Sequence, residues 1–250
     1  YDKTMQEVFR VSYMIKLGLT RVRNESDIIQ FTLDHMSTFC EKIIVYDDCS
    51  TDDTVAICNA HENVELVIEG DFWDPNRAVA EYENRHHLWL AAKERLQPND
   101  WFVYMDADEV IEFDWSTLSD DIDAVRMRLF DFYITEEDKE NLYLDRKWMG
   151  PEYRDILFAF RMGATSGWHG LDQRECTLTS GNVIQSGFVK HFGKAVSVQQ
   201  WEDTCEYYAT HFPMYADKWN ARRGKAIHTE SDFGRKLIRW KDRYTKGIRL

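Results

Sequence analysis

WFVYMDADEVIE, residues 101–112, is an apolar run that ends abruptly in a cluster of acids. Residues 101–105 are the aromatic and branched types typical of a strand buried on both faces. In an extended chain residues i and i+2 point the same way, so Asp106 and Asp108 share a face. Two such carboxylates form half of a site for Mg²⁺ or Mn²⁺, which take oxygen ligands from carboxylates, water and phosphate. The alternative is an acidic turn after a strand.

Three further strands precede this stretch and alternate with helices. The strands are predicted at residues 15–20, 42–46 and 64–69. One helix is predicted to start at Asp27 with Ser26 as its N-cap, a second after Ser50 or Thr51, and a third over residues 76–96. Alternation of this kind predicts a parallel sheet with helices on both faces.

Polar residues follow the carboxyl ends of these strands, where ligands bind in such sheets. The stretch RVRNES at residues 21–26 follows the first strand, Asp47 and Asp48 follow the second, and Asp106 and Asp108 follow the fourth. Three strand ends therefore supply polar groups to one crevice. This convergence favours a binding site over an isolated acidic turn.

The pattern changes in the second half of the chain. Strands are predicted without clear helices between them, which indicates a mixed or antiparallel arrangement. These strands span residues 124–134, 156–162 and 182–189, and helices follow at residues 198–211 and 231–244. We interpret the chain as one continuous α/β domain, with a nucleotide-binding half at 1–112 and an acceptor-binding half at 113–250.

Composition narrows the class of protein. The 250 residues are 44% hydrophobic and 14% aromatic, which excludes general disorder, and no apolar run approaches the roughly 20 residues that cross a bilayer. The net charge of -13 argues against a nucleic-acid binder. The start, YDKTMQEVFR, lacks the apolar core of a signal peptide, and its first residue, Tyr, is compatible with a fragment of a longer protein. Five cysteines without C-x-x-C spacing favour a reducing compartment, so we expect a cytoplasmic protein.

Positive charge is concentrated near the end of the chain. Residues 218–250 carry eleven Lys and Arg against three acids, a net +8, so the rest of the chain carries -21. This tail is interpreted as a helix face lying on an acidic body. The alternative is contact with an anionic substrate or with anionic lipid, which would make the protein peripherally membrane-associated.

Three segments, in this order and spacing, resemble the glycosyltransferase family 2 pattern on the GT-A fold. They are VRNESD at 22–27, IIVYDDCSTDDT at 43–54 and WFVYMDADEV at 101–110. The resemblance implies a Rossmann-like, mostly parallel sheet with flanking helices. It also implies a UDP-, GDP- or dTDP-sugar donor, a divalent metal (Mn²⁺ or Mg²⁺) on the donor diphosphate, and inversion at the anomeric carbon. The acceptor would be a hydroxyl of a saccharide, lipid or protein glycan.

The resemblance also implies which residues contact the nucleotide. Asp48, with Asp47 beside it, would contact the nucleobase. Arg21 and Arg23, in the loop after the first strand, would line the nucleotide pocket. Arg85, on the helix before the D-x-D strand, would reach the donor.

For the metal, the resemblance implies that Asp106 contacts ribose or a metal-bound water and that Asp108 is a direct ligand. The segment VKHFGKA at 189–195 resembles the later strand end that completes such sites, which makes His191 a third ligand. A carboxylate must also take the proton of the acceptor hydroxyl. The acidic pair of many inverting members has no clean copy here, and the candidates are Glu152, Asp155, Asp172 and Glu175.

Other functions fit parts of the sequence. DADEV matches the D-x-D-x-(T/V) motif of haloacid-dehalogenase-like phosphatases, in which Asp106 would be the nucleophile and Asp108 a general acid. That motif normally ends the first strand of its domain, whereas three strand-helix units precede it here. Nucleotidyltransferases need a Gly-rich loop after the first strand, which is absent. A sugar-binding protein without catalytic activity would bind nucleotide sugar and never turn it over.

Overall fold

The computed structural model describes residues 15–171 and 173–244, and its first half alternates strands and helices. The elements are β1 (Ile15–Val22), α1 (Ile29–Ser37), β2 (Cys40–Asp47), α2 (Thr54–Ala60), β3 (Val64–Glu69), α3 (Arg77–Lys93) and β4 (Trp101–Tyr104). The four strands pair in parallel in the order β3-β2-β1-β4. The predicted parallel α/β arrangement is confirmed.

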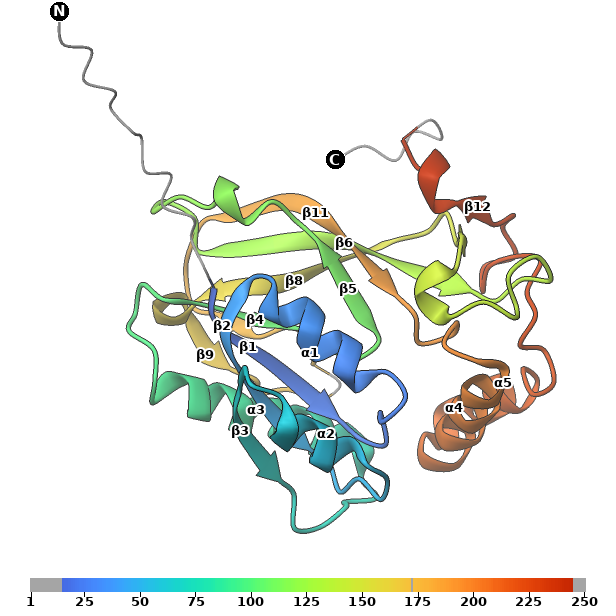
Figure 1. Cartoon of the computed structure of the whole chain (residues 1–250), viewed down its shortest axis with the longest axis horizontal. Helices are drawn as coiled ribbons and strands as arrows, with labels where there is room; N and C mark the ends of the chain where they lie inside the picture. Colours follow the sequence, from blue (N-terminus) through green and yellow to red (C-terminus); the bar gives the residue numbers. More distant parts are fainter. Residues whose placement is uncertain (1–14, 172, 245–250) are drawn as a thin grey trace, which may run out of the picture.

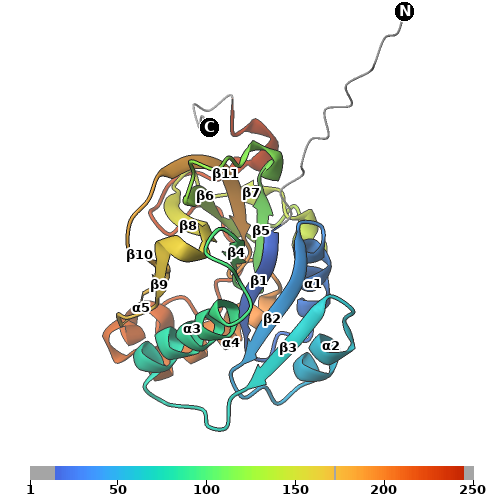
Figure 2. The ribbon, with the colours of Figure 1, turned by 90° about the vertical axis from the view of Figure 1, so that its left-hand side faces the viewer.

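Helices cover both faces of this parallel part, with α1 and α2 on one face and α3 on the other (Figure 1 and Figure 2). On the first face, Ile29, Leu33 and Met36 of α1 are buried against the sheet. On the second face, Leu88 and Trp89 of α3 lie in a separate apolar cluster. The sheet is therefore buried on both sides, which is why its strands read as continuous apolar runs.

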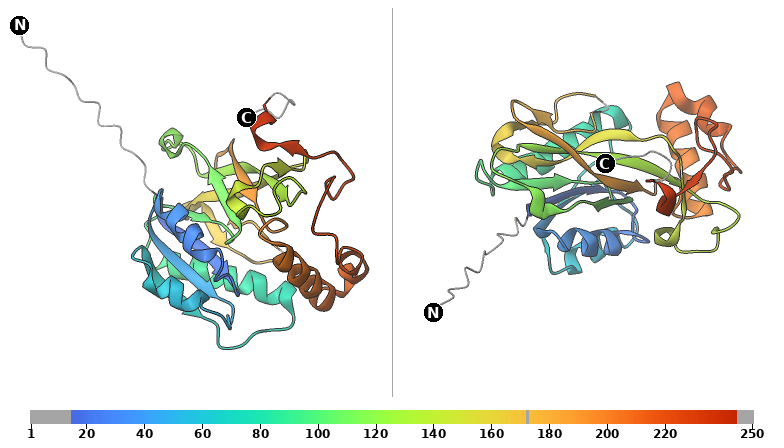
Figure 3. Two further views of the ribbon diagram at one scale, coloured as in Figure 1. Left: turned by 45° about the vertical axis from the view of Figure 1, so that its right-hand side comes forward. Right: turned by 90° about the horizontal axis from the view of Figure 1, so that it is seen from above.

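The second half extends the sheet with strands of mixed direction. Its elements are β5 (Glu109–Glu112), β6 (Ala124–Tyr133), β7 (Trp148–Met149), β8 (Arg154–Arg161), β9 (Thr165–Gly167), β10 (Thr177–Leu178), β11 (Val183–His191), α4 (Val198–His211), α5 (Ala216–Asn220) and β12 (Ile238–Arg239). β8 pairs antiparallel with both β4 and β6, so one sheet runs through both halves of the described chain. The predicted mixed arrangement is confirmed. The helices α4 and α5 pack together beyond the ends of the central strands (Figure 3).

The pairing of β11 determines where its last residue lies. β11 runs parallel to β6 and antiparallel to β5, with His191 opposite both Asp131 and Glu109. Because β5 begins directly after the D-x-D turn, this register brings the end of β11 to Asp108. Two segments about 80 residues apart in the sequence are joined in this way by ordinary sheet pairing.

The predicted helix at residues 231–244 is wrong. Gly234 has a φ of +68°, which an α-helix does not contain, and a turn forms around it. Ile238 and Arg239 then pair with β7, and only a short 3₁₀ turn, Trp240–Asp242, follows. Of the apolar residues whose spacing suggested a helix, Leu237 is buried, whereas Phe233 and Tyr244 are exposed, so they do not form one buried stripe.

Two predicted helix caps are also wrong. Helix α1 begins at Ile29, and Ser26 instead donates its backbone N–H to Asp52 at 3.1 Å. Helix α2 begins at Thr54, later than Ser50 or Thr51 would place it. Both loops make contacts with each other that compete with the local capping bonds.

No helix in the described ranges 15–171 and 173–244 is long and apolar enough to cross a bilayer. The basic tail, for which contact with anionic substrate or lipid is the alternative to a helix face on an acidic body, ends in residues 245–250, which lie outside the described residues. That contact stays a prediction.

Candidate active site

A cavity of about 790 Å³ opens at the carboxyl ends of β1, β4 and β11 and is closed on its far side by α4 and α5. Its charged lining consists of Arg21, Arg23, Glu25, Glu81, Arg85, Asp106, Asp108, Arg154, His191, Lys194, Asp203, Lys218, Arg222 and Asp232. In a chain with a net charge of -13, its seven Arg and Lys side chains slightly outnumber its six carboxylates. The cavity therefore carries a small positive excess within an acidic chain.

The loops after β1 and β2 hold each other in place. Asn24, with a φ of +53°, accepts the backbone N–H of Thr51 on its side-chain oxygen at 2.7 Å. Arg23 donates to the carbonyl oxygens of Asp48 and Cys49 at 2.6 and 2.9 Å. These contacts place Arg23 in the wall of the cavity, and its predicted role in a nucleotide pocket stays a prediction.

Asp47 and Asp48 lie behind this wall and do not line the cavity. Asp48 is buried and accepts hydrogen bonds from Arg21, at 3.1 Å, and from Arg77. Asp47 is also buried and accepts the backbone N–H of Ser50 at 2.9 Å. In this arrangement Asp48 orients two guanidinium groups, and the predicted contact with a nucleobase stays a prediction.

Asp106 is held by protein side chains. Its Oδ1 accepts the hydroxyl of Tyr104 at 2.7 Å, and its Oδ2 lies 3.3 Å from Nε of Arg174. Burial alone would raise the pKa of Asp106, but the guanidiniums of Arg174, Arg85 and Arg21 hold it well below its usual value. Asp106 is therefore ionised, and its hydrogen bond holds the Tyr104 hydroxyl in place.

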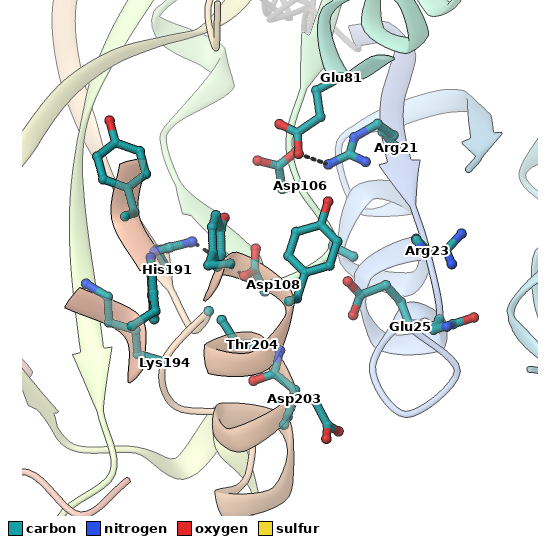
Figure 4. A pocket seen from close by; sticks show the side chains of 18 of the residues that line it. Arg21, Arg23, Glu25, Glu81, Asp106, Asp108, His191, Lys194, Asp203 and Thr204 are labelled. Carbon is teal, nitrogen blue, oxygen red and sulfur yellow. Dashed lines mark ion pairs between the residues drawn. The ribbon is translucent and has the colours of Figure 1, made fainter. Parts of the chain in front are cut away.

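Arg85 lies behind Asp106 and lines the cavity. Its Nε donates to the Tyr104 hydroxyl at 3.0 Å, and Glu81, one turn earlier on α3, lies 3.6 Å from its Nη2. Glu81 also lies 3.6 Å from Arg21. The two arginines predicted from separate segments are thus brought to the same wall, as Figure 4 shows for Arg21, Glu81 and Asp106.

Asp108 and His191 meet over a glycine. His191 Nε2 lies 3.4 Å from Asp108 Oδ2, and its Nδ1 lies 2.6 Å from Asp131 Oδ1. A Cβ on Gly193 would stand 2.6 Å from Asp108 Oδ2 and 2.9 Å from His191 Nε2, so only glycine leaves this space open. Burial alone would lower the pKa of His191, but Asp108 and Asp131 raise it to about 10.

This pair fits one side of a divalent-metal site. The carboxylate of Asp108 and the imidazole of His191 are both groups that bind divalent ions, and at 3.4 Å apart they lie near enough for one ion to contact both. A carboxylate that holds the other imidazole nitrogen, as Asp131 does, is the usual support of a metal-binding histidine. Asp108 and His191 would bind the ion, with water and diphosphate completing its coordination.

The structure does not bring the three predicted ligands together. Within residues 15–171 and 173–244 there is no group of three or more His, Cys, Asp or Glu side chains that could hold an ion. Asp106 is directed to Tyr104 and Arg174 instead, which leaves Asp108 and His191 as the pair.

Of the candidates for the catalytic base, the three that the structure describes, Glu152, Asp155 and Glu175, do not line the cavity. Glu152 accepts a hydrogen bond from Ser231 at 2.9 Å, and Asp155 lies 3.6 Å from Arg128. Glu175 pairs with Arg126 at 2.7 Å, and Asp172 lies outside the described residues.

Two other carboxylates face the cavity without an ion pair to any described residue. These are Glu25, after β1, and Asp203, on α4. Burial, together with the nearby charges of Asp108 and Asp106, raises the pKa of Glu25 well above its usual value. A carboxylate with a raised pKa is a stronger base, so Glu25 is the better candidate.

Several residues of the site were missed from the sequence. Arg77 joins Asp48 to Tyr207 of α4, and Arg174 joins Asp106 to Glu109. Lone arginines in a loop or at a helix start carry no recognisable signal. Asp131 was missed for a similar reason, although its place on a strand opposite the VKHFGKA segment could have suggested it had the register been known.

No protein-family model matches the chain. Uncharacterized proteins of Mycobacterium bovis and Mycobacterium tuberculosis are each 31% identical to it over 145 residues, which cover 56% of the chain. The chain spans about a third of the length of these relatives, because the match covers 32% of each.

Two solved structures are weakly similar. Glucosyl-3-phosphoglycerate synthase from Mycobacterium tuberculosis, in complex with Mn²⁺, UDP and glucosyl-3-phosphoglycerate, has a TM-score of 0.35 and 16% identity over 62% of this chain and 60% of its own. A 4-diphosphocytidyl-2C-methyl-D-erythritol synthase has a TM-score of 0.29 and 10% identity over 93% of this chain and 97% of its own. Because both TM-scores lie below 0.5, we base the function on the residues of this chain alone.

Proposed function

We propose that the chain is a metal-dependent glycosyltransferase that moves a sugar from a nucleotide-diphosphate donor to an acceptor hydroxyl. The observation that carries this proposal is the convergence of Asp108 and His191 over Gly193, on the floor of a cation-rich cavity. The phosphates of an anionic donor need such cations. A metal ion held by only one carboxylate and one imidazole needs further ligands, which the donor phosphates would supply.

Each wall of the cavity has a task in this reaction. Arg21, Arg23 and Arg85 would bind the nucleotide part of the donor through its phosphates. A Mg²⁺ or Mn²⁺ ion bound to Asp108 and His191 would neutralise the charge that develops on the leaving diphosphate. Glu25 would take the proton from the attacking hydroxyl, since burial and the charge of Asp108 raise its pKa and make it a stronger base. Attack from the face opposite the diphosphate would invert the anomeric carbon.

The geometry disfavours the phosphatase alternative. A nucleophilic aspartate needs a free carboxylate oxygen, whereas both oxygens of Asp106 have protein partners, Tyr104 and Arg174. Asp108, the general acid in that alternative, lies 3.4 Å from His191 and is paired with it instead of being free to face a leaving group.

Calorimetric titration tests the proposal. The protein is titrated with UDP, GDP and dTDP, each with and without Mn²⁺, and the nucleotide that binds is then supplied as a nucleotide sugar to measure nucleotide release. We expect micromolar binding that requires the metal and is lost in Asp108→Ala. Asp121→Ala, which removes an exposed carboxylate outside the cavity, is the control and should bind as the wild type does.

Binding of a nucleotide without metal, or unchanged metal-dependent binding in Asp108→Ala, would contradict the proposed site. Metal-dependent binding of a nucleotide sugar that is never hydrolysed or transferred would favour a sugar-binding protein without catalytic activity.

A further inference from the structure

Four cationic side chains line the cavity and have no task in the donor site proposed above. They come from β8, the turn after β11, α5 and the turn after α5. We call this set the cation cluster; it consists of Arg154, Lys194, Lys218 and Arg222.

The positive charge of the cation cluster is only partly neutralised. Asp131 lies 2.6 Å from Arg154 and 2.8 Å from Lys194. Asp232 lies 2.7 Å from Lys194 and 2.9 Å from Arg222. Arg154, Lys194 and Arg222 share these two carboxylates, and Lys218 adds a fourth positive charge, so the four cations and two carboxylates sum to +2 in a chain whose net charge is -13.

A purely structural role explains only part of the cluster. The pairs of Lys194 and Arg222 with Asp232 join the C-terminal segment to the sheet, and Lys194 is mostly buried, so these two cations need partners wherever they lie. Lys218 is different, because its side chain is exposed, lines the cavity and has no carboxylate partner among the described residues. It is the cation that remains available to a ligand.

The cluster is adjacent to the reacting centre but on the other side of it from the nucleotide. Lys194 shares the carboxylate of Asp131 with His191, whose Nε2 faces Asp108. In Figure 4, His191 and Lys194 lie across Asp108 from Arg21, Arg23 and Glu25. A ligand bound at Lys194 can therefore extend a second group toward Asp108 without entering the nucleotide wall.

We propose that the cation cluster binds an oxyanion, a phosphate or a carboxylate, that is carried by the acceptor. Ammonium and guanidinium groups bind such oxyanions through charge-assisted hydrogen bonds. The acceptor is then an acidic hydroxyl compound and not a neutral saccharide, with its hydroxyl directed across the cavity toward Glu25. This inference rests on the proposed transferase function.

The test measures binding of glycerol 3-phosphate, lactate and neutral glycerol by calorimetry. Each is titrated into the whole chain twice, once alone and once after saturation with Mn²⁺ and the nucleotide that binds. The variants are Lys218→Gln and, as a matched control, Lys225→Gln, which removes an exposed lysine outside the cavity seven residues later. Thermal unfolding of both variants checks that the fold is retained.

We expect glycerol 3-phosphate or lactate to bind the nucleotide-loaded protein and glycerol not to bind. Loss of one cation should weaken this binding about tenfold in Lys218→Gln, with no change in Lys225→Gln and no change in nucleotide affinity. The same Lys218-dependent binding in a protein that binds no nucleotide would uphold the oxyanion site and refute the transferase function.

Three results would overturn the inference. In the first, neither glycerol 3-phosphate nor lactate binds the protein. In the second, both bind Lys218→Gln as tightly as they bind the wild type. In the third, glycerol 3-phosphate competes with the nucleotide and Lys218→Gln weakens nucleotide binding about tenfold, which would assign the cluster to the donor diphosphate.

Discussion

Replacing Asp131 with asparagine removes the negative charge of this side chain but keeps its shape, so it shows how much that charge contributes to holding His191. Asp131 lies on β6 opposite His191, and its carboxylate contacts Nδ1 of His191 at 2.6 Å, Arg154 at 2.6 Å and Lys194 at 2.8 Å. Asn keeps an oxygen that can accept the Nδ1 proton but removes the negative charge. Asp108 and His191, the proposed metal ligands, are unchanged.

We expect Mn²⁺ to bind Asp131→Asn about 10- to 100-fold more weakly than the wild type, or about 1.4 to 2.8 kcal/mol. The carboxylate holds the imidazole in the orientation and tautomer that direct Nε2 at the ion, and the neutral amide does this less strongly. Calorimetric titration with Mn²⁺ in the presence of the nucleotide measures the difference. Asp155→Asn, on the neighbouring strand but outside the cavity, should retain the wild-type affinity.

The same substitution should lower the free energy of unfolding in a pH-dependent way. Removal of one partner from a buried ion pair costs about 3–5 kcal/mol, and because Lys194 keeps Asp232 and His191 keeps Asp108 we expect about 3 kcal/mol at pH 7. Burial alone would raise the pKa of Asp131, but His191, Lys194 and Arg154 hold it well below its usual value.

A lowered pKa means that this stabilisation is complete above the unfolded-state pKa, about 3.9, and is lost as the pH falls further. The difference between wild type and Asp131→Asn should therefore stay constant from pH 7 to pH 5 and shrink below about pH 4, as measured by urea unfolding. Wild-type Mn²⁺ affinity in Asp131→Asn would refute the proposed support of His191. A stability difference that does not change with pH would refute the ion-pair reasoning.

Two further substitutions test the space beside Asp108 and His191 and the proposed catalytic base Glu25. Gly193→Ala places a Cβ 2.6 Å from Asp108 Oδ2, so we expect it to push Asp108 and His191 apart and to weaken Mn²⁺ binding at least about tenfold with an unchanged circular dichroism spectrum. Glu25→Gln should lower kcat by about 10² to 10⁴ and leave nucleotide binding intact, because it removes only the proton acceptor. A larger loss of kcat in Asp203→Asn than in Glu25→Gln would assign the base to α4.

The sequence was sufficient for the architecture of the first half. Strands buried on both faces read as unbroken apolar runs, and their alternation with helices permits few arrangements other than a parallel sheet. The carboxyl ends of such strands meet at one edge, so the polar residues after β1, β2 and β4 were expected to lie near one another. Arg21, Arg23, Asp106 and Asp108 do line one cavity, whereas Asp47 and Asp48 lie behind its wall. Local pattern was enough because each of these elements is regular and follows its neighbour closely.

The same local reasoning failed where long-range contacts decide. The apolar residues of 231–244 have the spacing of a helix. Ile238 and Arg239 nevertheless pair with β7 and form the short strand β12 at the edge of the sheet. Ser26 is a good N-cap in isolation, yet its backbone is bonded to the neighbouring loop at Asp52. In both cases the tertiary partner satisfies backbone groups that the local structure would otherwise have satisfied.

The sequence by itself determined a parallel α/β sheet, the acidic turn at residues 106–109 and the presence of basic residues after β1. Only the tertiary structure decided that Arg174 and Tyr104 hold Asp106, that Asp131 holds His191, and that α4 and α5 close the cavity. The physical reason is that spacing along the chain fixes which side chains share a face, whereas strand register and side-chain ion pairs bring together residues that are far apart in sequence.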